Sequence, residues 1–531
     1  MEGLFMTDRS FPDDLRKHME ALESRLFEAV PHSDILPKLL SQIKRVDFVA
    51  KAFPDAVKNL QELKCLQSES ATVSPDGVIK PNPNFTPEKA ARLEQLLKIV
   101  EGYKVKERHK IVIAVDEVLE TAISNDWGLC RNADFVYLYN GAFWSQLDGN
   151  DIEAFLGKSF EKMGANPLDA KDFEIRAKLR KQFLAVAHLT TPERPKNTIL
   201  INLGNGTFEI SPNCQRLRPP SRADFITYQL PFKYESDATA PRWLAFLNEV
   251  QPDPERQKIL AEYLGYVFVS HKTLKLEKTL LLYGQGANGK SVFFEVVSAL
   301  LGKENVSSFS LQSLTNDSGY FRAKLANKLV NYASEINGTL ETAIFKQLVS
   351  GEPVEARLPY GQPFILHEYA KLIFNCNGLP KDVEQTNAYF RRFLIVPFDV
   401  TIPDEKQDKE LAQKIIDSEL SGVFNWALEG LKRLLDQKKF TYSEAVTKQI
   451  ERYKLESDSV RMFLEENGFV ASPTDYKLIK DFYSEYRAFC IDDGFKPVNK
   501  TNFITRLKND GINVEKKNIG NVAFVLRHSV L

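Results

Sequence analysis

The segment Gly284–Ser291 constrains the fold of this 531-residue chain more than any other part of its sequence. Its eight residues, GQGANGKS, match the phosphate-loop pattern G-x-x-x-x-G-K-[ST] at every fixed position. The apolar run Leu280–Tyr283 precedes it and is typical of a buried strand. Val292–Leu301 follows with the apolar spacing of a helix, and Gly302 ends that helix. The sequence therefore predicts a strand, a phosphate-binding loop and a helix in direct succession.

The residue types in this loop suit a nucleoside triphosphate. Glycines let backbone N–H groups approach phosphate oxygens closely, and the helix N-terminus adds a partial positive charge. Lys290 is expected to reach the β- and γ-phosphates, and the hydroxyl of Ser291 is expected to bind Mg²⁺. ATP and Mg²⁺ are thus the expected cofactors. The residues expected to hold the nucleotide are Gly284, Gln285, Gly286, Ala287, Asn288, Gly289, Lys290 and Ser291.

Two later apolar runs end in polar residues of the kind that an ATPase site needs. Leu329–Ala333 is followed by Ser334 and Glu335. A strand that brings an acid beside the phosphate loop suits a carboxylate that binds Mg²⁺ or activates water, so Glu335 is expected to be catalytic. A run beginning at Lys371 ends near Asn377, whose amide is expected to hold the attacking water. Asn375, in mid-strand, is expected to be a satisfied core or edge residue.

An arginine pair, Arg391 and Arg392, stands ahead of a further apolar run, Ile395–Phe398. In this position an arginine is able to act as a finger on the nucleotide of a neighbouring subunit, which stabilises transition-state charge and raises the rate by about three to five orders of magnitude. The alternative is a surface salt bridge, which contributes little to stability.

Composition limits the remaining possibilities. The net charge is −1 and 43% of residues are hydrophobic, so the chain has ample material for several cores, and any nucleic-acid surface is local. The five cysteines are far apart and form no C-x-x-C pair, which disfavours a zinc ribbon or a disulfide framework and suits a reducing cytoplasm. No apolar run approaches the length of a membrane span, and the N-terminus does not have the pattern of a signal peptide.

The chain divides into regions that differ in their predicted secondary structure. Residues 1–65 are predicted to be helical, with Leu15, Met19, Leu22, Leu26 and Val30 on one face, and residues 66–86 are predicted to be a linker. Thr86 and Pro87 should begin a helix. Residues 87–275 should form an α+β domain. It should contain a hairpin at 135–144, whose Asn140-Gly141 turn is predicted to be type I′, and a second strand pair at 198–210. An ATPase core should cover 276–405 and a helical segment 406–457.

The last region, residues 458–531, has the pattern of a winged helix. Three helices are predicted near 460–466, 477–491 and 500–510, followed by a hairpin over 512–526. Lysines and arginines on the third helix and near the hairpin suit contacts to DNA phosphates, and Lys500 and Arg506 are taken as DNA-binding candidates. The alternative is an ordinary solvated face, because nearby acids keep the region close to neutral.

These motifs together resemble the superfamily 3 helicases, in the phage and plasmid primase-helicase branch that includes the poxvirus primase-helicase. Gly284–Ser291 resembles motif A of that family, 333–337 resembles motif B, 345–357 resembles the start of motif B′, and 374–380 resembles motif C. Residues 111–275 are similar to the region that precedes the helicase in the family, and the tail is similar to its winged-helix end. Residues 1–110 have no such counterpart.

The resemblance implies an α/β fold of the AAA+ type, with a mainly parallel sheet flanked by helices, an α+β region before it and a winged-helix domain after it. It implies a ring, usually a hexamer, with ATP between subunits. It also implies 3′ to 5′ movement on a single strand of forked DNA, in the cytoplasm of a bacterial host or virus-infected cell. A separate primase or polymerase is an expected partner, because residues 1–110 contain no zinc-binding cysteines and no paired-aspartate strand.

The sequence departs from the family pattern at two places. Members often carry a Tyr-Lys pair in the hairpin that contacts DNA, whereas this chain has Tyr360-Gly361. Arg357, Tyr360 and His367 are therefore the expected DNA contacts. Motif B has Ser334 where an aspartate is frequent, which leaves Glu335 as the acid.

Two other functions fit parts of the pattern. The chain is alternatively a non-motor DNA-binding initiator or loader that uses ATP only to control assembly. It is also compatible with a different phosphate-loop enzyme, such as a small-molecule kinase, which would need an acceptor pocket and no arginine from a neighbour.

Overall fold

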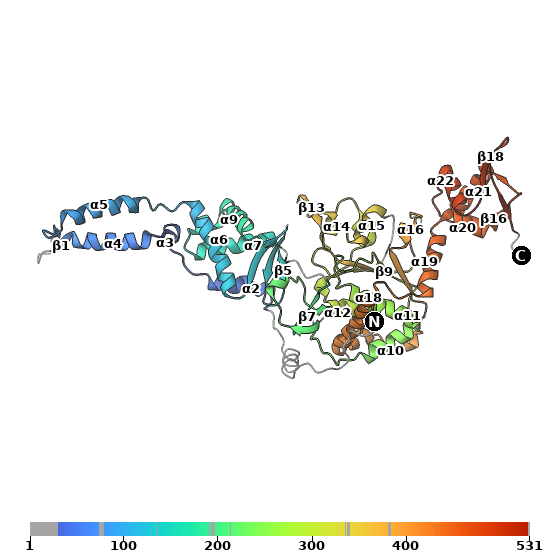
Figure 1. Ribbon diagram of the computed structural model, residues 1–531, viewed down its shortest axis with the longest axis horizontal. Coiled ribbons are helices and arrows are strands. Elements are labelled where there is room, and N and C mark those ends of the chain that lie inside the picture. Colours follow the sequence, from blue (N-terminus) through green and yellow to red (C-terminus); the bar gives the residue numbers. More distant parts are fainter. Residues whose placement is uncertain are drawn as a thin grey trace. The chain divides into compact units, whose positions relative to one another are not determined.

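The computed structural model describes residues 30–73, 79–133, 135–190, 192, 197–212, 214–334, 336, 340–359, 361–380 and 384–528 (Figure 1). The described chain forms two compact units. One contains 27–194 together with 220–227, and the other contains 195–219 and 228–531. Leu15, Met19, Leu22 and Leu26 lie outside the described residues. Among the helices described, none is both long and apolar enough to cross a membrane.

The first unit is an α+β assembly around one apolar core. Its three-stranded antiparallel sheet has the order β3-β4-β5, and helices α6, α7 and α9 contribute residues such as Val115, Phe160 and Phe183 to the core. Its elements are α2 (His32–Gln42), α3 (Phe48–Ala52), α4 (Ala56–Glu69), β1 (Ala71–Val73), β2 (Ile79–Pro81), α5 (Pro87–Glu101), α6 (Glu107–Ser124), β3 (Gly128–Asn132), β4 (Phe135–Tyr139), β5 (Trp144–Leu147), α7 (Gly149–Lys162), α8 (Pro167–Lys171) and α9 (Phe173–Val186).

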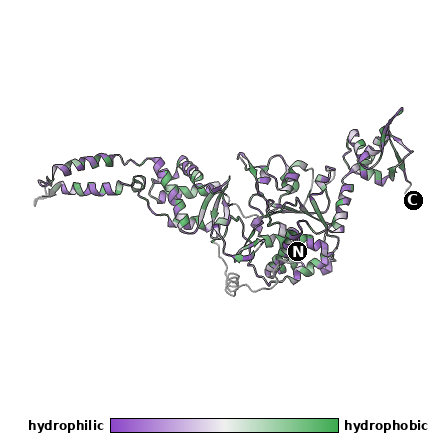
Figure 2. Cartoon of the chain, viewed as in Figure 1, coloured by the Kyte–Doolittle hydropathy of each residue, from purple (hydrophilic) through white to green (hydrophobic). Residues whose placement is uncertain are grey.

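The segment expected to be a linker, 66–86, contains regular structure. Helix α4 continues to Glu69, and β1 and β2 pair antiparallel between α4 and α5. Polar and apolar residues alternate along both helices, which pack mainly against one another (Figure 2). The expected start of α5 is confirmed, because the side chain of Thr86 accepts a hydrogen bond from the backbone N–H of Lys89 and Pro87 is its first residue.

The hairpin predicted at 135–144 is confirmed, but the prediction of a two-residue turn is wrong. Tyr139 pairs with Trp144, so four residues connect β4 to β5. The side chain of Asn140 accepts hydrogen bonds from the backbone N–H groups of Ala142 and Phe143, which stabilises the longer loop.

The second unit is built on a five-stranded sheet whose strands are all parallel, in the order β10-β11-β14-β9-β15. Strands β14 and β15 are buried along their whole length, as expected where helices cover both faces of a parallel sheet. In Figure 1, α12 and α15 lie on opposite sides of the strands. The strands of this sheet are β9 (Thr279–Tyr283), β10 (Val306–Ser307), β11 (Val330–Ala333), β14 (Lys371–Cys376) and β15 (Phe393–Pro397).

The remaining elements of this part surround the sheet or extend from it. The strand pair predicted at 198–210 is confirmed and has a third strand beside it. These elements are β6 (Ile199–Leu203), β7 (Gly206–Ser211), β8 (Cys214–Arg218), α10 (Pro241–Val250), α11 (Pro254–Tyr266), α12 (Lys290–Leu301), α13 (Leu311–Thr315), α14 (Tyr320–Ala323), α15 (Thr342–Ser350), β12 (Val354–Arg357), β13 (Pro363–Leu366), α16 (Asn387–Phe390), α17 (Leu411–Ser418), α18 (Leu420–Gln437) and α19 (Glu444–Glu456).

The last region has its own aromatic core, including Phe463, Phe482 and Phe503. The three predicted helices and the predicted hairpin are present in the expected order. Further short strands at 469–471, 477–478 and 525–527 extend the pattern. Its elements are α20 (Ser459–Glu466), β16 (Phe469–Ala471), β17 (Lys477–Leu478), α21 (Ile479–Asp492), α22 (Lys500–Asn509), β18 (Val514–Lys517), β19 (Gly520–Ala523) and β20 (Val525–Arg527).

Two glycines allow α11 and α18 to pack closely. A Cβ at Gly430 would lie 2.3 Å from the carbonyl carbon of Ala261, and a Cβ at Gly265 would lie 2.5 Å from the Cβ of Leu431. Both distances are shorter than van der Waals contact, so the two helices pack at this separation only because these residues have no side chain.

Replacing Gly430 by Ala should therefore lower the free energy of unfolding by about 2 kcal/mol, the scale of an overpacked core. Thermal unfolding should show a fall in apparent Tm. Gly149→Ala is the control, because its Cβ would meet only the flexible guanidinium of Arg180, at 3.2 Å. Equal Tm values for the two variants would contradict the close-packing account.

Candidate functional site

The glycine-rich loop lies between β9 and α12, as its sequence predicts. Gly289 precedes α12 with a φ of 84°, in the left-handed region that favours glycine. A Cβ there would lie 2.8 Å from Val250 and 2.9 Å from Phe246. At Gly284 a Cβ would lie 2.3 Å from the carbonyl oxygen of Phe398. Two of the loop glycines are therefore required by neighbouring atoms, whereas Gly286 has nothing within 4 Å.

Lys290 folds back into this loop. Its ammonium donates to the carbonyl oxygens of Gly284 and Gln285, the latter at 3.1 Å, and to the side-chain oxygen of Asn288 at 2.9 Å. Only 7% of the residue is exposed, and burial lowers its pKa. A buried ammonium whose charged form is destabilised favours an anion beside it. The loop, the N-terminus of α12 and Lys290 thus fit a phosphate group.

The chain after β15 fixes the loop from one side. The backbone N–H of Phe398 donates to the carbonyl of Tyr283 at 2.6 Å, and that of Ile402 donates to Ala287 at 2.8 Å. The side chain of Asn288 donates to the carbonyl of Phe398 at 3.0 Å. The loop is therefore held in a defined shape by hydrogen bonds within the protein, which suits a preformed binding site.

Strand β14 places Asn377 beside the loop. The backbone N–H of Gly284 donates to the carbonyl of Cys376 at 3.1 Å, so the residue after Cys376 lies directly next to the start of the loop. Asn377 is exposed there. Asn375 is buried, and its side-chain oxygen accepts a hydrogen bond from the hydroxyl of Tyr332 at 3.0 Å, which confirms the prediction that it is a satisfied core residue.

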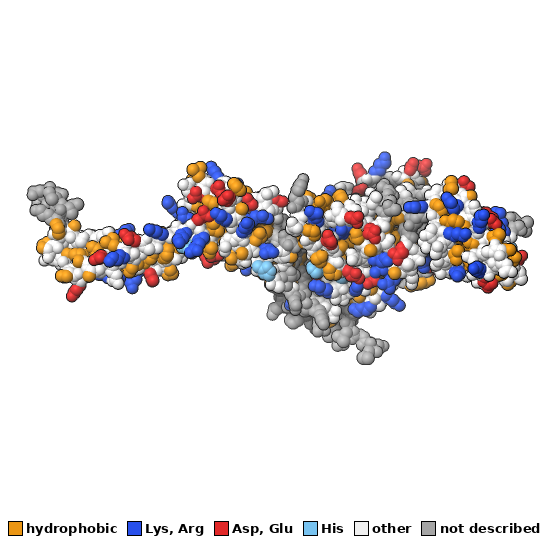
Figure 3. Space-filling view, turned by 90° about the horizontal axis from the view of Figure 1, so that it is seen from above, with side chains coloured by type: hydrophobic (Ala, Val, Ile, Leu, Met, Phe, Trp, Pro, Cys, Tyr) orange, Lys and Arg blue, Asp and Glu red, His pale blue; other side chains and the backbone are white. Residues whose placement is uncertain are grey.

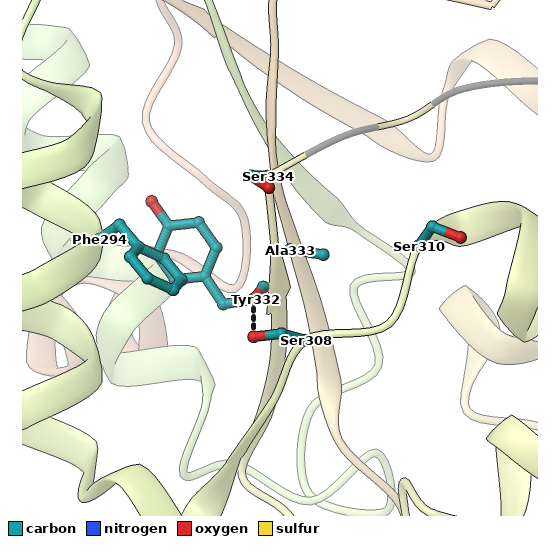
Figure 4. Close-up of a pocket in the computed structure, with 6 residues that line it drawn as sticks. All are labelled: Phe294, Ser308, Ser310, Tyr332, Ala333 and Ser334. Carbon is teal, nitrogen blue, oxygen red and sulfur yellow. Dashed lines mark hydrogen bonds between the residues drawn. The ribbon is translucent and has the colours of Figure 1, made fainter.

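A pocket of about 340 Å³ lies at the carboxyl ends of β10 and β11 (Figure 4). It is lined by Phe294, Ser308, Ser310, Tyr332, Ala333 and Ser334. Ser334 is exposed at the end of β11, and Ser291 is exposed in the first turn of α12. Glu335, the expected acid, lies outside the described residues, as do the residues 337–339. Three serines, Ser308, Ser310 and Ser334, therefore line this pocket, and Ser291 is not among its lining residues.

The arginine pair lies at the amino ends of the parallel strands, away from the phosphate loop. Thr279 pairs with Phe393 and Tyr283 pairs with Pro397, so Arg391 and Arg392 stand at the amino ends of the strands. Four residue steps along β9, about 13 Å, separate the amino ends of the strands from the phosphate loop. The structure does not bring the pair to the phosphate loop of the same chain.

The two arginines have different surroundings. Arg392 is 7% exposed and donates to the hydroxyl of Ser350 at 2.9 Å and to the carbonyl of Ala388. The side chain of Arg391 is 58% exposed, and its Nη2 donates to Glu277 at 3.1 Å. Arg391 is therefore the member of the pair that a neighbouring molecule is able to reach.

The expected DNA hairpin is present as β12 and β13, which pair antiparallel. Arg357 is exposed at the end of β12, His367 is exposed directly after β13, and Tyr360 lies outside the described residues. Helix α14 packs beside β12, where Arg322 donates to the carbonyl of Glu355 at 2.7 Å. Two aromatic residues of α14, Tyr320 and Phe321, are 38% and 37% exposed. Neither residue was predicted from the sequence, although the Tyr-Phe pair directly after Gly319 is a usable signal.

The basic candidates in the last region differ from each other. Lys500 is exposed at the start of α22. Arg506 donates to the carboxylate of Asp458 at 2.8 Å, and that carboxylate is 5% exposed. This ion pair joins α22 to the first turn of α20. Arg506 is thus engaged within the fold, and its role in DNA binding stays a prediction. On the face seen in Figure 3, cations and acids are interspersed, in keeping with the net charge of −1.

Family models match two parts of the chain. Residues 116–252 match the family described as "D5 N terminal like", and residues 282–392 match "Family of unknown function (DUF5906)". The second match begins in β9 and ends at Arg392, so it covers the whole set of motifs from the phosphate loop to the arginine pair.

Curated relatives come from large DNA viruses. "Putative helicase L207/L206" of Acanthamoeba polyphaga mimivirus is 26% identical over 215 residues, covering 38% of this chain and 22% of the relative. "Putative helicase 121R" of Invertebrate iridescent virus 3 is 21% identical over 361 residues, covering 59% of this chain and 37% of the relative. The chain thus spans well under half the length of these relatives. The resemblance to viral primase-helicase proteins is confirmed.

A solved structure titled "The A form apo structure of NrS-1 C terminal region-CTR" aligns with 77% of this chain and 98% of its own. Sequence identity is 12% and the TM-score is 0.43. At that TM-score the likeness is too loose to support a conclusion.

Replacing Gly289 by Ala should weaken binding of a nucleoside triphosphate, because the new Cβ would force the left-handed residue and its contacts with Phe246 and Val250 to shift. We expect the Kd of a fluorescent ATP analogue to rise at least about tenfold, equivalent to 1.4 kcal/mol. Gly286→Ala is the matched control, and its Kd should change little. A larger effect at Gly286 than at Gly289 would show that the loop binds in a different shape.

Proposed function

We propose that this chain is an ATP-dependent DNA helicase that acts in the replication of a phage, plasmid or integrated element. The observation that carries the proposal is the placement of two groups on one sheet. The phosphate loop lies at the carboxyl ends of the parallel strands, and Arg391 lies exposed at their amino ends. Such a site is complete only when another copy supplies the arginine. The helicase names of the viral relatives support the same function.

Each residue has a defined part in this proposal. Lys290 and the loop N–H groups would hold the phosphates, and Ser291 would bind Mg²⁺, which would supply charge neutralisation. Glu335 accepts a proton from the attacking water, Asn377 positions that water, and Arg391 of the adjacent copy stabilises the charge that develops. Arg392, held by Ser350, supports the backbone from which Arg391 extends.

The proposed assembly is an AAA+-type ring, usually a hexamer, with DNA in its centre. The hairpin β12–β13 would contact one strand through Arg357 and His367, and Tyr360, which lies between the two strands in the sequence, is a further proposed contact. Tyr320 and Phe321 of α14 offer aromatic surfaces on which bases stack. The last region, as a winged helix, would contact DNA phosphates through Lys500. Movement is proposed to run 3′ to 5′, with a separate primase or polymerase as partner.

Replacing Lys290 by Ala should abolish hydrolysis of ATP and its stimulation by single-stranded DNA, because the loop loses its phosphate-binding cation. The rate of phosphate release, measured with and without single-stranded DNA, gives both the rate of hydrolysis and its stimulation. Lys303→Ala, an exposed lysine beyond α12, should leave the rate unchanged. If DNA does not stimulate hydrolysis by the unaltered chain, the helicase proposal is wrong.

The alternative is a non-motor initiator or loader that uses ATP to control assembly. A fluorescence assay that detects displacement of one strand from a forked duplex distinguishes the two functions. A helicase should displace the strand only while ATP is hydrolysed. Binding of DNA without displacement would favour the loader.

Replacing Arg357 by Ala should weaken binding to single-stranded DNA and lower the stimulation of hydrolysis. The slope of log K against log salt should fall by about 1, as expected for one lost phosphate contact. Titration at several salt concentrations measures this. Arg108→Ala, an exposed arginine at the start of α6, is the control. An unchanged slope in Arg357→Ala would remove the hairpin from the DNA site.

A further inference from the structure

Three cationic side chains near the amino ends of the central strands surround one carboxylate, that of Glu277. Its Oε2 lies 3.1 Å from Nη2 of Arg391 and 3.8 Å from Nη2 of Arg392, and its Oε1 lies 3.2 Å from Nζ of Lys275. The side chain of Glu277 is 23% exposed. Its backbone is in the left-handed region, with a φ of 55°, directly before β9. Such a conformation is uncommon for a residue other than glycine, and it places this carboxylate beside the arginine pair.

Neighbouring groups fix the backbone that carries Arg391. The ammonium of Lys278 donates to the carbonyl oxygens of Arg391 and Phe393, the latter at 3.4 Å. Burial and the adjacent charge of Arg391 lower the pKa of Lys278 to about 8. The next residue, Arg392, is anchored on Ser350. The main chain at Arg391 is thus held from both sides, and its side chain extends into solvent.

Glu277 restrains that side chain without enclosing it. The contact uses Nη2, and the structure shows no other side-chain partner for Arg391 among the residues that it describes. Since a guanidinium has five N–H donors, most of them remain open to a ligand. An ion pair whose arginine is exposed to solvent is weak, so it orients the arginine and still allows it to move to a stronger partner.

We propose that Glu277 is a positioning residue that holds Arg391 extended at the edge of one subunit, ready for the triphosphate bound by the adjacent copy. This inference rests on the proposed function. Arginine has a long side chain with many rotamers, and ordering it at the moment of reaction slows the step. A carboxylate that orders it beforehand raises the rate without touching the nucleotide.

Replacing Glu277 by Gln should lower kcat for ATP about tenfold and leave KM almost unchanged, because the nucleotide loop is unaltered. Glu277→Asp should give an intermediate rate. Glu352→Gln is the matched control, since Glu352 lies 3.8 Å from Lys275 but does not contact Arg391. Apparent Tm identifies any variant that fails to fold. An unchanged kcat in Glu277→Gln, or an equal loss in Glu352→Gln, would overturn the inference.

Mixing variants separates positioning of Arg391 from a structural role. Lys290→Ala subunits lack a working loop but keep Glu277 and Arg391, whereas Glu277→Gln subunits keep the loop. The mixture should hydrolyse ATP faster than either variant alone. The reference is a mixture of Lys290→Ala with Arg391→Ala. Recovery in the reference alone would overturn the role of Glu277 and leave the proposed function intact. If neither mixture recovers activity, the shared site itself is wrong and the inference about Glu277 is wrong with it.

Discussion

The parallel register of β9 with β14 and β15 determines where the residues of the candidate site lie. It brings Gly284 beside Cys376 and therefore brings Asn377 beside the phosphate loop. The same register puts Arg391 at the opposite end of β15. Because a strand is stiff and extended, no side-chain rotation closes this separation within one chain. In the proposed function a second copy would bring the two groups together, so hydrolysis would require an assembly.

A short path of contacts joins the arginine pair to the hairpin. Ser350 ends α15 and is 1% exposed, and it accepts a hydrogen bond from Arg392. The hairpin strand β12 begins at Val354, shortly after that helix. Tyr369, which follows β13, donates to the carbonyl oxygens of Gln347 and Glu352 at 3.1 and 2.8 Å. A shift of Arg392 would therefore be passed to both ends of the hairpin, and in the proposed function this path would couple hydrolysis to DNA movement.

The core of the second unit was predictable because its signals are local. A phosphate loop between an apolar run and a helix leaves few alternatives, and buried parallel strands show as continuous apolar runs. The loop between β4 and β5 was not predictable from its Asn-Gly pair, because the side chain of Asn140 stabilises four residues instead of two. The short strands β1 and β2 lie in a segment whose serines and prolines indicate a linker, and only their pairing with each other reveals them.

The candidate site was predictable in its residue types and less so in its surroundings. The sequence indicates an arginine pair but not which member is exposed, since that depends on Ser350, far away in the chain. Glu277 carries no motif, and its role follows only from the three cations around it. Likewise, the pairing of Arg506 with Asp458 joins residues 48 positions apart, which no local pattern shows.

The rate of ATP hydrolysis per subunit, measured over a wide range of protein concentration with DNA present, tests the shared site most directly. The account predicts a rate per subunit that falls steeply on dilution, once assemblies dissociate and Arg391 no longer reaches a neighbour's nucleotide. A rate per subunit that stays constant down to concentrations at which light scattering shows only monomers would contradict it.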